Sequence, residues 1–158
     1  MDVAGALLAP KNITISPTPE NLTQIVAQSG NAVQACKMQK TSDIIWQDAQ
    51  HQGLFEILDL LNEPTADREV LRRLEAYTEY HFALEEQYMI ALDYPGREAH
   101  ENSHAQFRQE ISQLVQSDQQ LDAQFREIIS TFLTEWLTRH VFGIDKELEE
   151  FILRSPAK

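Results

Sequence analysis

Along most of the chain, apolar residues recur at steps of three and four positions, and alternation with a period of two is almost absent. This spacing is typical of amphipathic helices that turn one apolar stripe toward a core. Turns at Pro64 and Pro95 separate the apolar runs. The pattern predicts four helices, over residues 44–62, 66–92, 97–116 and 119–154.

Short polar segments join these predicted helices and supply candidate capping residues. We expect Thr65 to cap the second helix and Ser117-Asp118 to cap the fourth. Gly143 is a weak point inside the fourth helix. Long amphipathic helices joined by short turns predict an all-α fold, an up-down-up-down antiparallel four-helix bundle over residues 44–158.

The first 43 residues do not share this pattern. They are punctuated by Pro10, Pro17 and Pro19, and a weak helical pattern from about residue 19 to 38 contains Gly30. We therefore expect residues 1–43 to form an N-terminal extension, either an arm or an extra helix packed on the bundle. We also expect any protein partner to bind through this segment.

Composition narrows the possible functions. The chain has 158 residues and a formal net charge of −12, which would repel nucleic acid and anionic lipid. No run approaches the roughly 18 apolar residues of a membrane span, and the first ten residues lack the basic region of a signal peptide. Cys36 is the only cysteine, which excludes a disulfide within the chain and a cysteine-based zinc site. We expect a cytoplasmic protein with neither a nucleic-acid nor a membrane partner.

All five histidines fall on predicted helices, on or beside an apolar stripe. A single histidine there is more often an ordinary core residue, but acidic residues accompany these at fixed offsets. His81 and Glu85 are four residues apart, as are His100 and His104, so each pair shares a helix face about 5–6 Å apart. An ionised Glu85 on an inner stripe would be destabilising unless it were paired or bound a cation. The pattern predicts a metal site in the bundle interior.

The first and last helices add further candidate ligands. His51 precedes Leu54 and Phe55 by three and four residues, so it also faces inward. His140 and Asp145 are five residues apart, and on an ideal helix they would point about 140° away from each other. Both reach one site only if the turn is widened, which Gly143 would permit. Five imidazoles and two carboxylates suit two bridged metal ions, and this ligand set favours iron.

These residues resemble the hemerythrin family, specifically its bacterial members. The resemblance runs in order through Asp48-Ala49-Gln50-His51-Gln52-Gly53-Leu54-Phe55, His81-Phe82-Ala83-Leu84-Glu85-Glu86 with Met89, Tyr94-Pro95, His100-x3-His104-x2-Phe107 and Trp136-Leu137-Thr138-Arg139-His140-x4-Asp145. The N-terminal segment to about Ile45 falls outside it.

The resemblance implies a non-haem di-iron centre with an oxo or hydroxo bridge. One iron would take His100, His104 and His140, the other would take His51 and His81, and Glu85 and Asp145 would bridge them. The two-histidine iron would keep an open position for dioxygen. The implied function is reversible dioxygen binding for carriage, storage, delivery or sensing, not enzymatic turnover.

Four apolar residues near these motifs are candidate walls of the dioxygen pocket as well as core residues. They are Leu137, Phe55, Phe107 and Trp136. Leu137 lies three residues before His140, so its side chain should cover the site. The acidic residues Glu86, Glu147, Glu149 and Glu150 are expected to be solvated.

An enzymatic alternative is a di-iron oxidase, peroxidase or iron-handling enzyme of the ferritin-like kind. Such bundles use carboxylate-rich sites built on Glu-x-x-His repeats. This chain has a single Glu-x-x-His sequence, Glu101 to His104, and no second copy of it, and His51 has Asp48 three positions before it. The sequence therefore favours oxygen binding over the enzymatic alternative.

Overall fold

The computed structural model describes residues 39–156. The predicted helix over residues 19–38 lies outside the described residues, as does all of the N-terminal extension except residues 39–43. No helix in the described range is both long and apolar enough to cross a membrane.

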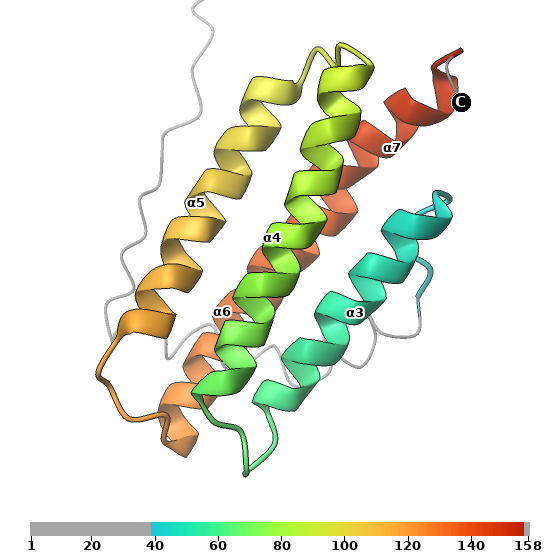
Figure 1. Cartoon of the computed structure of the whole chain (residues 1–158). Helices are drawn as coiled ribbons and strands as arrows, with labels where there is room; N and C mark the ends of the chain where they lie inside the picture. Colours follow the sequence, from blue (N-terminus) through green and yellow to red (C-terminus); the bar gives the residue numbers. More distant parts are fainter. Residues whose placement is uncertain (1–38, 157–158) are drawn as a thin grey trace, which may run out of the picture.

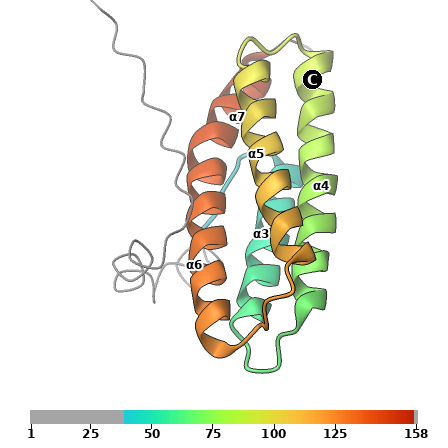
Figure 2. The same cartoon turned by 90° about the vertical axis from the view of Figure 1, so that its left-hand side faces the viewer.

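The described part of the chain contains helices and no strand. The elements in chain order are α3 (Ile45–Leu61), α4 (Arg68–Ala91), α5 (Arg97–Gln116), α6 (Ala123–Arg139), η1 (His140–Ile144) and α7 (Asp145–Arg154). α4 packs against α3 and α5, and α3 packs against α6 (Figure 1). Turned by 90°, α6 and α7 follow one another as a single long rod (Figure 2). The predicted all-α four-helix bundle is confirmed.

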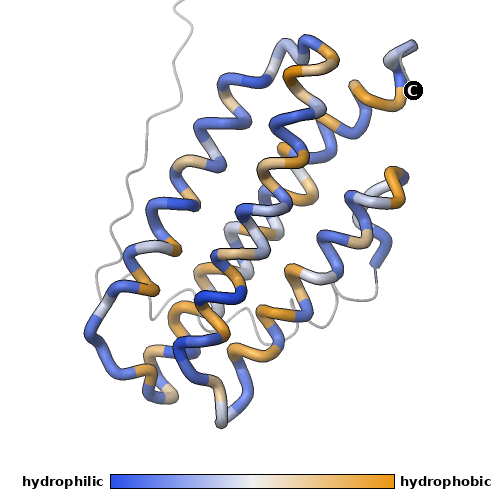
Figure 3. Tube along the Cα trace, in the orientation of Figure 1, coloured by the Kyte–Doolittle hydropathy of each residue, from blue (hydrophilic) through white to orange (hydrophobic). Residues whose placement is uncertain are grey.

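The core lies along the inner stripe of every helix. Apolar positions recur along each helix with polar positions between them (Figure 3). The fully buried apolar residues include Leu54, Phe55, Leu58, Leu71, Phe82, Phe107, Leu133 and Leu137. Burial of these side chains is the main force that packs α3, α4, α5 and the continuous last rod (α6, η1 and α7) together.

Two predicted caps are wrong. The side chain of Asp67, rather than Thr65, caps α4 by accepting from the backbone N–H of Glu69. Asp122 caps α6 by accepting from Phe125, so the last rod begins at residue 123 instead of 119. In both cases a carboxylate one position before the helix satisfies a free N–H and favours the positive end of the helix dipole.

A tertiary contact explains the longer connection before α6. The guanidinium group of Arg68 donates to the carbonyl oxygens of Leu114 and Val115 at the end of α5, and to that of Gln119. Carbonyls at a helix end have no partner within the helix, so Arg68 satisfies them and holds the connection against the end of α5. The contact joins the start of α4 to the end of α5.

The last rod contains the widened turn that the sequence requires. η1 is a π-helical turn, and the backbone N–H of Asp145 donates to the carbonyl of His140, five residues earlier. This wider turn brings the two side chains to the same side of the rod. Gly143 lies within the turn, but a Cβ there would meet no atom within 4 Å and its φ is not positive. The widening therefore does not depend on the conformational freedom of glycine.

Candidate metal centre

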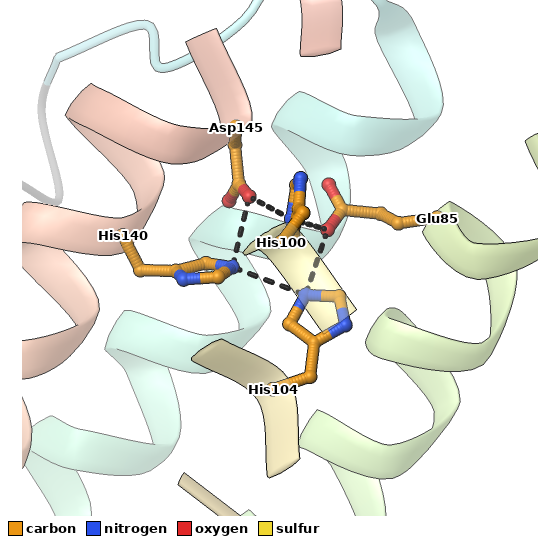
Figure 4. Close-up of side chains that lie close together, drawn as sticks. All are labelled: Glu85, His100, His104, His140 and Asp145. Atoms are coloured by element: carbon orange, nitrogen blue, oxygen red, sulfur yellow. Dashed lines mark hydrogen bonds and ion pairs between the residues drawn. The ribbon is translucent and has the colours of Figure 1, made fainter. Parts of the chain in front are cut away.

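Five of the seven predicted ligands form one compact group (Figure 4). The Nε2 atoms of His100 and His104 lie 3.2 and 3.4 Å from Glu85 Oε2. Those of His100 and His140 lie 3.2 and 3.0 Å from Asp145 Oδ1. The side chains come from α4, α5, η1 and α7, so the group forms only when the bundle is assembled.

The other two histidines form a second group with the same carboxylates. His51 Nε2 lies 3.1 Å from Asp145 Oδ2, and His81 Nε2 lies 3.8 Å from that oxygen. His81 Nε2 is also 3.8 Å from Glu85 Oε1. Within each of the two groups, the possible ligand atoms lie within 4.8 Å of one another. We refer to them below as the three-histidine group and the two-histidine group.

Metal ions would give partners to the buried polar atoms of this site that have no hydrogen bond. All seven side chains are buried, and in the described part of the chain neither Glu85 nor Asp145 pairs with lysine or arginine. Buried atoms without a hydrogen-bond partner include His51 Nε2, His81 Nε2, Glu85 Oε2, His100 Nε2 and both oxygens of Asp145. Buried polar groups are normally satisfied, and these converge on one interior region. The donor set therefore fits metal ions.

Two further histidine nitrogens face each other across the site. The Nε2 atoms of His104 and His140 are 3.1 Å apart. When each of these atoms carries a lone pair, the pair is repulsive unless a proton or a metal ion lies between or beside them. This arrangement is a second indication that the interior is built around positive charge.

The outer nitrogen of His51 is fixed by the segment before α3. His51 Nδ1 lies 2.9 Å from Thr41 Oγ1, and Thr41 donates its hydroxyl proton to Asp48 at 2.8 Å. An ionised carboxylate can only accept, so Thr41 must accept from Nδ1–H of His51. This tautomer leaves Nε2 unprotonated and directed into the site, as a metal ligand requires.

Other side chains hold the outer nitrogens of the α4 and α5 histidines. His81 Nδ1 lies 2.9 Å from the amide oxygen of Gln50, and His104 Nδ1 lies 2.9 Å from Glu86 Oε1. Arg108 also donates to Glu86, at 2.8 Å. The prediction that Glu86 is solvated is therefore wrong: the side chain is partly buried and orients His104. Metal-binding histidines commonly have such partners.

The pKa values of Glu85 and His100 show that the site favours positive charge. Burial and the charge of Asp145 raise the pKa of Glu85, but the surrounding imidazoles outweigh them and lower it to about 2. Burial lowers the pKa of His100, but hydrogen bonds to Asp145 and Glu85 outweigh burial and raise it to about 9. Without metal, protons on imidazole therefore compensate the two carboxylates.

Aromatic rings cover one side of the three-histidine group. Trp136 stacks on His140 with ring centroids 4.6 Å apart, and Phe107 lies 4.2 Å from Trp136. Phe82 stacks on His104 at 3.8 Å, a site contact that the sequence did not identify. The other two predicted pocket residues, Leu137 and Phe55, are fully buried in the adjoining hydrophobic core.

One of the residues predicted to be solvated on the last helix is buried. Glu149 accepts from the backbone N–H of Asp43 at 2.8 Å and pairs with Lys146 at 2.7 Å. Its burial follows from the segment before α3, which lies against α7. The sequence pattern did not predict this contact because the pairing spans 106 positions of the chain.

Sequence reasoning also missed the uncharged residues that support the ligands. Thr41, Gln47 and Gln50 are all buried beside them. A weak signal was present for Gln47, because it precedes His51 by four residues and so lies on the same inner stripe. A buried amide at such a position requires a partner, here Glu85, to which it donates at 2.7 Å.

Comparison with known proteins agrees with this donor set. The family model described as "Hemerythrin HHE cation binding domain" matches residues 43–152. Myohemerythrin of Riftia pachyptila is 32% identical over 98 residues, covering 62% of this chain and 76% of that protein. Bacteriohemerythrin of Clostridium acetobutylicum is 27% identical over 112 residues, covering 63% and 86%. Bacteriohemerythrin of Stenotrophomonas maltophilia is 30% identical over 108 residues, covering 63% and 68%.

No solved structure matches the chain. The family model nevertheless spans more than half of the sequence and includes every residue of both histidine groups. With its helical bundle and buried histidine-carboxylate cluster, the chain belongs to the hemerythrin family, whose members are non-haem di-iron proteins that bind dioxygen and are not enzymes.

Proposed function

We propose that the seven buried side chains hold two iron ions. The three-histidine group would bind one ion through His100, His104 and His140, and the two-histidine group would bind the other through His51 and His81. Glu85 and Asp145 would bridge them, and an oxo or hydroxo group would complete the bridge. The proposal is supported by the two carboxylates, which are common to both groups of possible ligand atoms.

We infer that the site binds dioxygen reversibly. When bound, a pair of ferrous ions supplies the electrons that dioxygen takes up on binding and returns on release. The observation that carries this inference is the unequal size of the two groups, because the two-histidine group offers four ligand residues and the three-histidine group offers five. The smaller group leaves more of an octahedral coordination sphere for a diatomic ligand.

The chain's own residues would keep the metal site as a whole dry and the ligands fixed. Leu137, Phe55 and Phe107 are fully buried, and Trp136 stacks on a site histidine. Apolar walls exclude the water that would promote irreversible oxidation, which favours release of dioxygen over further chemistry. Among the described residues, the two groups contain two carboxylates, Glu85 and Asp145. In this proposal both bind the metal ions, so neither is left free to act as an acid toward bound dioxygen.

Reversible binding would serve oxygen carriage, storage, delivery or sensing. The test is the visible spectrum of the iron-loaded full chain, reduced without air, then exposed to air, then freed of oxygen again. We expect a charge-transfer band that appears with oxygen and disappears when oxygen is removed, with one dioxygen bound per two irons. A single irreversible oxidation that consumes dioxygen would contradict this proposal and favour an oxidase.

A further inference from the structure

Gln47 lies in the bundle interior without being one of the seven candidate ligands. It is fully buried on α3, and its amide Nε2 donates to Glu85 Oε1 at 2.7 Å. Its amide oxygen accepts from Ser42 Oγ, also at 2.7 Å. Ser42, in the segment before α3, is thus connected through one side chain to a carboxylate shared by both histidine groups.

Neighbouring hydrogen bonds fix which end of the amide faces Glu85. Ser42 Oγ accepts from the backbone N–H of Ile44 at 3.0 Å, which leaves its hydroxyl proton to be donated to Gln47. An ionised carboxylate can only accept, so the atom of Gln47 that faces Glu85 is the nitrogen and the atom that faces the Ser42 hydroxyl is the oxygen. The NH₂ group therefore faces Glu85, where a carboxylate oxygen accepts it.

The two oxygens of Glu85 are consequently in different surroundings. Oε1 accepts from Gln47 and lies 3.8 Å from His81 Nε2, on the side of the two-histidine group. Oε2 has no hydrogen-bond partner and lies 3.2 Å from His100 Nε2. A fixed hydrogen bond at Oε1 holds the carboxylate in the one orientation that presents an oxygen to each group.

We propose that Gln47, itself held by Ser42, is a positioning residue for the metal centre. It fixes Glu85 so that the two-histidine group is complete. This inference rests on the two-metal site of the proposed function. The two-histidine group depends most on the contact, because Glu85 is one of four candidate ligands there and one of five in the other group. Partners that orient metal ligands typically contribute about 10–100-fold to metal affinity.

The test is a stepwise titration of the metal-free full chain with Co²⁺, using chelator competition to obtain each affinity. Gln47→Leu removes the amide and puts an apolar side chain of similar volume in its place. The weaker of the two binding steps belongs to the two-histidine group, which offers fewer ligands. We expect the affinity of that step to fall at least tenfold and the affinity of the tighter step to change less than threefold. Ser42→Ala, which frees the amide to rotate, should weaken the same step by a smaller factor.

Gln52→Leu is the matched control, because Gln52 lies on the same helix and, among the residues that the structure describes, its amide donates only to the backbone oxygen of Gln39. It should leave both affinities unchanged, and thermal melting of each metal-free variant reports any loss of the fold. Unchanged affinities in Gln47→Leu, or an equal loss in both steps, would overturn the role of Gln47 and leave the two-metal site intact. Binding of only one Co²⁺ by the unmodified chain would overturn the two-metal site itself.

Discussion

At the scale of single residues, Glu85 and Asp145 determine what the bundle interior can hold. Both carboxylates are buried, and both contact histidines from each of the two groups. An isolated buried carboxylate costs several kcal/mol, so the fold requires compensating positive charge at this place. Imidazolium supplies that charge in the metal-free chain, and metal ions would supply it in the loaded chain.

Replacing Glu85 with alanine should prevent the paired centre from forming. The change removes a ligand from both groups at once and leaves the neighbouring positive charge uncompensated. Metal analysis of protein produced with ample iron should give two irons per chain for the unmodified protein and at most one for the variant. Glu150→Ala, at an exposed position on α7, is the control and should keep both. Two irons in the Glu85 variant would show that this residue is not a bridge.

Replacing Leu137 with alanine should quicken loss of bound dioxygen to the irreversibly oxidised form. Leu137 is fully buried three residues before His140, and its truncation would enlarge the pocket and admit water. The autoxidation rate should rise while the iron content stays the same. Leu133→Ala, also fully buried but one helical turn earlier on α6 and so farther from His140, controls for the roughly 2–5 kcal/mol cost of such a truncation. Equal rates in the two variants would place Leu137 in the ordinary core.

The sequence identified the seven candidate ligands and not the residues that support them. Charged or imidazole side chains on an apolar stripe are visible because they violate the helical pattern, and the structure brings all seven together. Their role as ligands remains a prediction. Thr41 and Gln47 could not be recognised, because an uncharged polar side chain is common at a helix surface and becomes significant only when the fold buries it.

At the scale of elements, the helices follow from local periodicity and their ends follow from tertiary contacts. The helix predicted over residues 97–116 has those bounds in the structure. The last rod begins four residues later than predicted, because Arg68 holds the preceding connection against the end of α5. A cap is chosen by which polar side chain the fold places beside a free N–H, and spacing alone does not determine that choice.

Two glycines on the rods should respond oppositely to alanine. A Cβ at Gly53 on α3 would collide with the ring and hydroxyl of Tyr77 on α4, so Gly53→Ala should destabilise the metal-free chain by about 1–3 kcal/mol. A Cβ at Gly143 meets nothing within 4 Å, so Gly143→Ala should stabilise the chain by about 0.4–1 kcal/mol through the unfolded state. Denaturant unfolding measures both effects. Destabilisation by Gly143→Ala comparable to that of Gly53→Ala would mean that the π-helical turn requires glycine.

At the scale of the whole molecule, the site links the stability of the fold to pH. The four rods contribute ligands to one interior, so protonation there is a property of the assembled bundle. His100 has a pKa of about 9 in the folded metal-free chain, against 6.5 as the ordinary value. Glu85 has a pKa of about 2, against 4.5. Unfolding returns both groups to their ordinary values.

The metal-free chain should therefore be most stable between pH 4.5 and 6.5. The stability contributed by His100 is fully present below pH 6.5 and is lost as the pH rises to about 9. The stability contributed by Glu85 is present above pH 4.5 and is lost as the pH falls toward 2. Chemical unfolding across this range is the measurement. Stability that stays constant from pH 6.5 to 9 would contradict the coupling between His100 and the carboxylates.

The most direct test of the central claim is a crystal structure of the iron-loaded protein, with anomalous scattering measured at the iron absorption edge. We expect two iron peaks inside the bundle, one contacted by His100, His104 and His140 and the other by His51 and His81, with Glu85 and Asp145 contacting both. One peak, or iron bound by other side chains, would contradict the proposal that these seven residues form a paired metal centre.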